Sequence, residues 1–159
     1  MTDDDFLGFM LDSDETYNAG DTTWVAVRSD IAEYHAYRVK PPMNRQLCLV
    51  REPHNEYDEN AVAVMHGSSI VGHVPRNLAS IMSPLIKDNI ILKAVALYTG
   101  VIRNDGAYRG GGCKLEAVYM LETGNNSNAM RVEKLVKERG FCGNVFFDSL
   151  CHLTFSLSD

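Results

Sequence analysis

The residues best suited to chemistry gather in one ten-residue stretch, REPHNEYDEN, at residues 51–60. It combines arginine, glutamate, asparagine, tyrosine and aspartate side chains, and an apolar run flanks it on each side, at residues 46–50 and 61–65. A polar loop carried by a rigid sheet is a common way to build a binding site. The sequence therefore predicts a ligand-binding loop between two strands.

The same residue types also serve purely structural roles. Asn55 and Asp58 commonly cap turns by accepting hydrogen bonds from their own backbone. Arg51 and Glu52 would hold the turn if they formed an ion pair. From the residue types alone, capping is the more frequent role, and binding is the alternative.

Catalytic and metal chemistry have little support in the sequence. The cysteine and histidines nearest the loop lack the spacing of a zinc site. The acidic residues of the loop have no catalytic lysine beside them, so a metal-dependent nuclease is the least favoured reading. We expect a binding module with no catalytic residues, metal or cofactor.

The net charge of −6 is unevenly distributed along the chain. Residues 1–21 carry seven acids and no base, residues 22–122 carry ten acids and eleven bases, and residues 123–159 carry four of each. The first segment is expected to be a disordered acidic leader, with a short interaction segment at residues 6–11 as the alternative. The remainder is nearly neutral and does not repel nucleic acid as the whole-chain pI of about 5.3 would indicate.

No targeting signal is visible. No apolar run approaches the roughly 18 residues of a membrane helix, and the N-terminus lacks the basic region of a signal peptide. The four cysteines form no CxxC pair and are expected to be reduced, mostly buried thiols. These features favour an intracellular protein without membrane contact.

Apolar periodicity predicts a mostly β chain, of the α+β class, in the part that must position the loop. Tyr98 and Tyr119 lie within apolar runs and are assigned to the core. Gly67-Ser68-Ser69 is expected to form a tight hairpin turn. Strands are expected over residues 22–27, 31–39, 46–50, 61–65, 70–74, 90–102 and 114–121.

One helix is expected within this part, over residues 75–88. Asn77 is a candidate N-cap for it. Pro84 predicts either two short helices or a break, because proline cannot donate the helical hydrogen bond.

Residues 123–159 are expected to form a helix-and-strand appendix. A linker at residues 124–128 precedes a helix over 130–139 that ends at Gly140, and an apolar strand follows over 141–157. The sequence leaves open whether this appendix completes the core or forms a dimer contact.

The loop and the segment after it resemble the HIRAN domain, which occurs at the N-terminus of helicase-like transcription factor and related SWI/SNF-type proteins. REPHNEYDENAVAV and then IVGHVPRNLASIMSPLI carry the resemblance, which extends over about residues 22–122. Nine of fourteen motif positions match: Arg51, Glu52, Pro53, Asn55, Tyr57, Asp58, Asn60, Ala61 and Val64.

The resemblance implies a small OB-like β-barrel that binds single-stranded DNA and captures its free 3′-hydroxyl end. It assigns Tyr57 and Asp58 to the terminal nucleotide, and Tyr37 and Tyr108 to base stacking. Asn55 belongs to the same motif. Arg38, Arg76 and Arg109 are candidates for phosphate contacts. The setting it implies is DNA repair or replication in the nucleus.

The chain departs from the family pattern upstream of the loop. An arginine and two adjacent aromatic residues are expected there, whereas this chain has His35, Ala36 and Tyr37. Neither an ATPase motif nor a RING-type cysteine cluster is present. The alternative function is an adaptor that has lost DNA binding and docks a protein partner through the acidic leader or residues 130–157.

Overall fold

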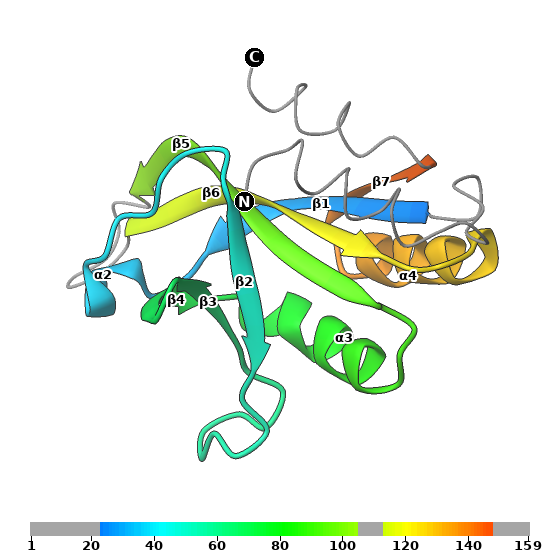
Figure 1. The fold of residues 1–159 in the computed structure, drawn as a ribbon, viewed down its shortest axis with the longest axis horizontal. Helices are drawn as coiled ribbons and strands as arrows, with labels where there is room; N and C mark the ends of the chain where they lie inside the picture. The colour runs from blue at the N-terminus through cyan, green and yellow to red at the C-terminus, as the bar shows by residue number, and fades with distance from the viewer. Residues whose placement is uncertain (1–22, 105–112, 148–159) are drawn as a thin grey trace.

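The computed structural model describes residues 23–104 and 113–147 (Figure 1). The elements follow in the order β1 (Thr23–Ile31), α2 (Tyr34–Tyr37), β2 (Gln46–Arg51), β3 (Val62–His66), β4 (Ser69–His73), α3 (Arg76–Lys87), β5 (Lys93–Asn104), β6 (Cys113–Glu122), α4 (Asn126–Glu138) and β7 (Cys142–Phe147). None of the described helices is long and apolar enough to cross a membrane.

The strands form one antiparallel sheet in the order β4-β3-β2-β5-β6-β1-β7. The sheet curls until the end of β1 meets β4, where Ala32 and His73 exchange two backbone hydrogen bonds of 2.8 and 2.9 Å. We call this contact the seam. It closes β1 to β6 into a small OB-like barrel, so the expected mostly β, OB-like fold is confirmed.

Gly72 makes the seam possible. A Cβ atom at this position would lie 2.3 Å from the carbonyl oxygen of Ala32 and 2.7 Å from Cγ2 of Ile31. Both distances are shorter than any normal contact, so only glycine lets the two strands approach this closely.

The main core fills the barrel between the sheet and the two longer helices, which both lie below β1, β5 and β6 in Figure 1. Tyr98 and Tyr119 are fully buried, as predicted. Tyr119 donates a hydrogen bond of 2.7 Å to the backbone oxygen of Asp30, so its hydroxyl has a partner inside the protein.

The expected strand over residues 31–39 is wrong after Ile31. Tyr34–Tyr37 form a helical turn between two residues in the left-handed region, Glu33 (φ 65°) and Arg38 (φ 56°). The two left-handed residues turn the chain away from an extended path at both ends. As a result, α2 lies beside the seam.

The helix α3 is continuous, so the expected break at Pro84 is also wrong. Pro84 lies in the last turns with its side chain exposed, while its neighbours Ser83 and Leu85 are buried. Burial of the apolar face outweighs the single hydrogen bond that proline removes. The N-cap position is Pro75, and not Asn77 as expected.

The helix α4 begins earlier than expected. The side chain of Asn125 accepts a hydrogen bond of 2.8 Å from the backbone nitrogen of Asn128, which starts the helix inside the expected linker. Gly140 follows the helix with φ 88°, as predicted for a C′ glycine.

Residues 126–147 complete the core. Ala129, Val132 and Val136 of α4 are fully buried within the main core cluster, and β7 pairs with β1 along its length. Cys48 and Cys142 are free thiols, as expected, but both are exposed, so the expectation that they are buried is wrong for these two.

Candidate functional site

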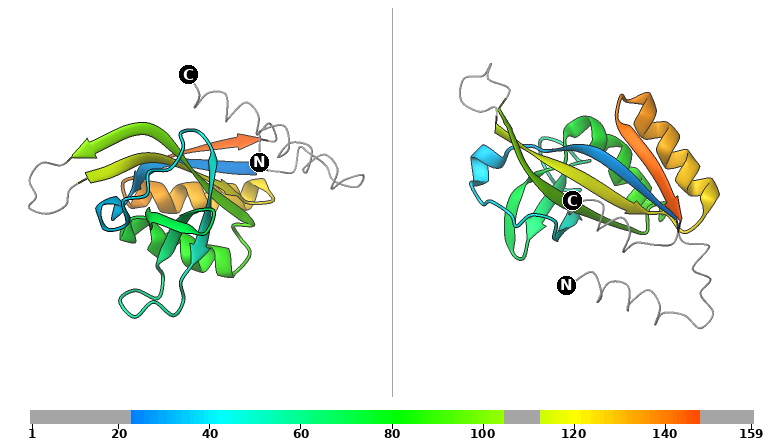
Figure 2. Two further views of the ribbon diagram at one scale, coloured as in Figure 1. Left: turned by 60° about the vertical axis from the view of Figure 1, so that its left-hand side comes forward. Right: turned by 90° about the horizontal axis from the view of Figure 1, so that it is seen from above.

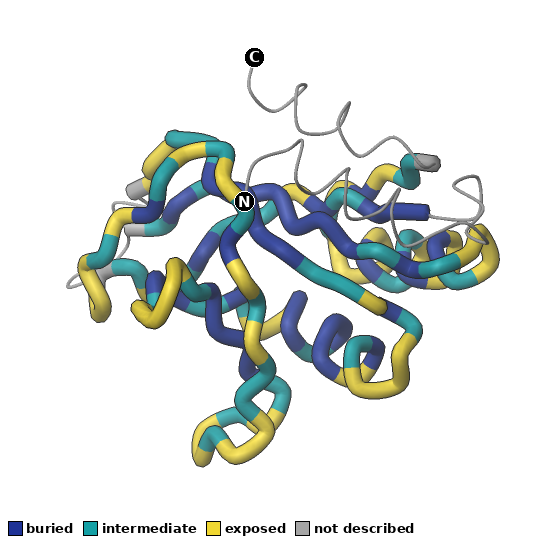
Figure 3. The backbone as a smooth tube through the Cα atoms, in the orientation of Figure 1, coloured by how far each residue is buried: buried dark blue, intermediate teal, exposed yellow. Residues whose placement is uncertain are grey.

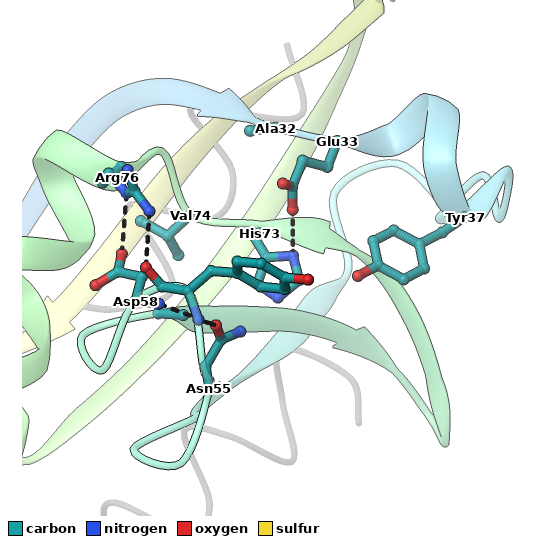
Figure 4. Close-up of a pocket in the computed structure, with 10 residues that line it drawn as sticks. Ala32, Glu33, Tyr37, Asn55, Asp58, His73, Val74 and Arg76 are labelled. Atoms are coloured by element: carbon teal, nitrogen blue, oxygen red, sulfur yellow. Dashed lines mark hydrogen bonds and ion pairs between the residues drawn. The ribbon is translucent and has the colours of Figure 1, made fainter.

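A pocket of about 550 Å³ opens beside the seam. Its walls come from α2, the 51–61 loop, the end of β4 and the first residue of α3 (Figure 4). Ten residues line it: Ala32, Glu33, Tyr37, Asn55, Tyr57, Asp58, Ala61, His73, Val74 and Arg76. Polar groups from four separate segments therefore converge on one cavity next to the loop that the sequence singled out.

Asn55 and Asp58 hold the loop in shape. The Asn55 side-chain oxygen accepts hydrogen bonds from the backbone nitrogens of Tyr57 (2.8 Å) and Asp58 (3.0 Å). Oδ1 of Asp58 accepts from the backbone nitrogen of Asn60 at 2.9 Å. Asn55 and Asp58 therefore do cap the turn. Only one carboxylate oxygen of Asp58 takes part in this cap, so the second can contact another group.

That second oxygen faces Arg76, the first residue of α3. Oδ2 of Asp58 lies 3.4 Å from Nε of Arg76, whose Nη2 donates to the backbone oxygen of Tyr57 at 3.1 Å. The Arg76 side chain is 73% exposed and that of Asp58 is 21% exposed. A ligand in the pocket can thus approach a carboxylate and a guanidinium together (Figure 4).

Two tyrosines supply aromatic surface to the pocket. Tyr57 is 83% exposed on the loop and Tyr37 is 36% exposed on α2. Burial and the nearby carboxylates of Glu33 and Glu52 raise the pKa of Tyr37, so its hydroxyl stays protonated at neutral pH. Both rings line the same pocket, so a ligand there can meet two aromatic surfaces.

His73 connects the pocket walls. Its Nδ1 lies 2.7 Å from Oε1 of Glu33, and its Nε2 lies 2.8 Å from Oε1 of Glu52. The contact of Nε2 with Glu52 is a hydrogen bond, whereas Nδ1 lies close to Glu33 without the geometry of one. The ring of Tyr37 lies 5.8 Å away, centroid to centroid, at a tilt of 48°.

Five of the eight predicted site residues line the pocket: Tyr37, Asn55, Tyr57, Asp58 and Arg76. Arg38 follows α2 with an exposed side chain and does not line it. Tyr108 and Arg109 lie outside the described residues.

His73 and Glu33 were missed by sequence reasoning. The only signal for His73 is a polar residue in an otherwise apolar run, and Glu33 has no local signal. The expected ion pair between Arg51 and Glu52 is wrong, because Nε of Arg51 donates to Oγ of Ser83 at 3.0 Å while Glu52 contacts His73. Within the described residues, no group of three or more His, Cys, Asp or Glu side chains is placed to hold a metal ion.

The closed sheet and the pocket at its seam place the chain among small OB-like β-barrel domains. The family model of the HIRAN domain matches residues 32–116, which is more than half of the chain. The chain belongs to the HIRAN domain family.

Solved structures share the fold. The crystal structure of the HIRAN domain of human HLTF superposes with a TM-score of 0.59 at 18% identity and covers 79% of this chain and 98% of that chain. The NMR structure of the HLTF HIRAN domain in its DNA-bound conformation gives a TM-score of 0.53 at 21% identity, with coverage of 79% and 97%.

A curated relative matches a shorter stretch. It is described as a SWI/SNF-related matrix-associated actin-dependent regulator of chromatin, subfamily A member 3-like 1, from Arabidopsis thaliana. The match is 44% identical over 45 residues, which is 28% of this chain and 5% of the relative. The matched part of this chain thus spans a small fraction of that protein's length.

Proposed function

We propose that this chain is a non-enzymatic binding module that holds the free 3′-hydroxyl end of single-stranded DNA in the pocket beside the seam. The observation that carries the proposal is the convergence of Tyr37, Tyr57, Asp58 and Arg76 on one cavity. Membership of the HIRAN family supports it, as does a structural neighbour described in a DNA-bound conformation. DNA repair or replication in the nucleus is the setting that we propose.

Asp58 would recognise the end of the strand. A carboxylate oxygen has two lone pairs, so Oδ2 can accept a hydrogen bond from a terminal hydroxyl beside its contact with Arg76. A terminal phosphate in the same position would bring two negative groups together. Selectivity for a free hydroxyl then follows from one charge, without the reading of any base.

The aromatic residues would supply affinity that does not depend on sequence. Stacking on Tyr57 and Tyr37 would contribute on the order of 1–3 kcal/mol for each base. Arg76 is placed to meet the phosphate next to the terminal sugar, because its side chain is largely exposed at the pocket.

Asp58→Asn tests the end recognition. The amide oxygen can still accept from Asn60, so the turn keeps its cap, while the charge is lost. We expect affinity for a 3′-hydroxyl oligonucleotide to fall by about 1.5–3 kcal/mol, the range for hydrogen bonds to charged groups. Discrimination against a 3′-phosphate should shrink in parallel. Fluorescence anisotropy with two oligonucleotides that differ only in the 3′ group measures both.

Glu59→Gln is the matched control, because it removes the same charge from an exposed residue of the same loop that does not line the pocket. It should leave the discrimination unchanged. Equal affinity of the unmodified protein for both 3′ groups would rule out end capture. Absence of binding to any oligonucleotide at low salt would instead favour the protein-docking adaptor.

A further inference from the structure

The exposed side of α4 carries positive charge outside the pocket. All four basic residues of residues 123–159 fall within residues 131–139, in this helix and its cap. Three of them, Arg131, Lys134 and Arg139, are exposed and are here called the α4 ridge. None of the three lies within residues 32–116, so the match to the family model assigns them no role.

The ridge is not neutralised by the acids of its own helix. The fourth base, Lys137, is balanced by Glu133, because its Nζ lies 3.2 Å from Oε2 of that residue. Within the described residues, no acid forms an ion pair with a residue of the α4 ridge. Glu138 is the other acid of α4 and is exposed. Three positive charges and this one negative charge leave the exposed side of the helix basic.

Arg139 brings the ridge next to the pocket. Its Nη1 donates hydrogen bonds to Oγ of Ser80 at 3.0 Å and to the backbone oxygen of Asn77 at 3.4 Å. Ser80 follows Arg76 by four residues in α3, so their side chains are neighbours on one face of that helix. Because Arg76 lines the pocket, Arg139 lies along the helix face that begins there.

The ridge leads away from the pocket along α4. Arg131 precedes Arg139 by eight residues, which is about two turns and about 12 Å along the axis. Both helices lie below β1, β5 and β6 in Figure 1 and in the left view of Figure 2. Figure 3 shows exposed stretches along α4. A path of exposed cations therefore runs from Arg76 across the first turns of α3 and along α4.

A strand that is held by its 3′ end has to leave the pocket, and its phosphates follow one another at regular spacing. Proteins that bind single strands combine aromatic stacking with a positively charged surface that follows the backbone. We propose that the strand leaves past Arg76 and lays its next phosphates along the α4 ridge, toward its 5′ end. This inference rests on the proposed function, because it requires the 3′ end in the pocket.

Arg139 can hold α3 and a phosphate together. A guanidinium has five N–H donors in a planar fork, and only Nη1 is engaged with Ser80 and Asn77. The other donors can meet a phosphate that passes between the two helices.

The test compares two 3′-hydroxyl oligonucleotides of about four and about twelve nucleotides, lengths within the range of single-strand sites on OB folds. Fluorescence anisotropy over a series of salt concentrations gives the slope of log affinity against log salt for each. Each phosphate neutralised on a single strand contributes roughly 0.7 to this slope. For the unmodified protein, the slope of the longer oligonucleotide should exceed that of the shorter one by about 2, because the ridge has three cations.

Arg131→Gln combined with Lys134→Gln removes two of these charges and leaves Arg139, which bonds to α3, in place. The slope for the longer oligonucleotide should fall by about 1.4. The slope for the shorter one and its preference for a 3′-hydroxyl should stay unchanged.

The matched control is Arg45→Gln combined with Lys87→Gln, which removes two exposed cations outside both the pocket and α4. It should leave both slopes unchanged. Circular dichroism verifies that each variant is folded.

Equal slopes for the two oligonucleotides in the unmodified protein, or an unchanged slope for the longer one in the α4 variant, would overturn the ridge as a path for the strand. Equal weakening of both oligonucleotides would overturn it too, because the variant would then act on the pocket. In these cases a preference for a 3′-hydroxyl would still support the proposed function. Failure of the unmodified protein to bind either oligonucleotide would refute the proposed function, and the ridge proposal with it.

Discussion

Glu116 is a carboxylate held by three donors. Arg103 and Thr99 donate hydrogen bonds to it, the latter at 2.9 Å, and Arg28 lies 3.5 Å away. The hydrogen bond from Arg103 is the main cause that lowers the pKa of Glu116 below its ordinary value of 4.5. The group ties β6 to β5 and β1, close to the end of β1.

The lowered pKa of Glu116 predicts how the stability of the fold changes as the pH becomes acidic. Because the folded-state pKa lies below the unfolded one, Glu116 stabilises the fold above pH 4.5, and this contribution is lost as the pH falls through the folded-state pKa. Glu116→Gln should therefore lower the melting temperature at pH 7 and make it less sensitive to pH below 4.5. Thermal unfolding between pH 7 and pH 3 measures both effects.

Glu122→Gln is the control, because the pKa of Glu122 is shifted in the opposite direction. Burial raises the pKa of Glu122, so its charged form is disfavoured and its removal should not lower stability at pH 7. If the melting temperature of Glu116→Gln fell more steeply below pH 4.5 than that of the unmodified protein, this account of Glu116 would be contradicted.

At the scale of the elements, the barrel depends on one close approach between β1 and β4. The seam has two backbone hydrogen bonds, and Gly72 leaves no space for a Cβ atom. The clash would be with a backbone oxygen, which cannot move away like the end of a flexible side chain.

Gly72→Ala should therefore open the seam. We expect a loss of about 3 kcal/mol in the free energy of unfolding, at the upper end of the cost of overpacking. Urea denaturation measures this loss, and oligonucleotide binding should fall with it because Ala32 and His73 line the pocket.

Gly67→Ala is the control on the same hairpin. Gly67 has φ 62° and nothing within 4 Å of a Cβ atom, so only local backbone strain of roughly 1 kcal/mol is expected. Equal losses in the two variants would show that the seam is not the cause.

At the scale of the whole molecule, Arg76 is the one Lys or Arg among the described residues that line the pocket, which limits how strongly salt should affect DNA binding there. Each phosphate neutralised on a single strand contributes roughly 0.7 to the slope of log affinity against log salt. Arg76→Ala should reduce the slope by about 0.7 if Arg76 meets a phosphate. Lys87→Ala, at the exposed far end of the same helix, should leave the slope unchanged. An unchanged slope in Arg76→Ala would mean that Arg76 serves only to hold Asp58 and the loop.

Local patterns account for the parts of the fold that were predicted well. The short apolar runs at residues 46–50, 61–65 and 70–74 predict β2, β3 and β4 to within a residue or two, because a short apolar run bounded by turn residues is typical of a buried strand. The Asn55 and Asp58 turn was recognisable from residue types that cap their own backbone. The motif also predicted the loop residues that line the pocket.

Long-range geometry accounts for what was missed. The seam joins Ala32 to His73, and no local pattern encodes a pairing between segments so far apart. The turn of α2 is too short to show a helical period, and it depends on left-handed residues at both ends. Glu33 and His73 belong to the pocket only because the barrel closes there.

The seam and the pocket share the residues Ala32 and His73. Closure of the barrel and occupancy of the pocket are therefore linked equilibria, and a ligand that binds only the closed form stabilises it by RT ln(1 + [L]/Kd). A bound end of a DNA strand would therefore stabilise the seam between β1 and β4. The protein would be hardest to open while it holds its ligand, and release of the strand would return the barrel to its less stable state.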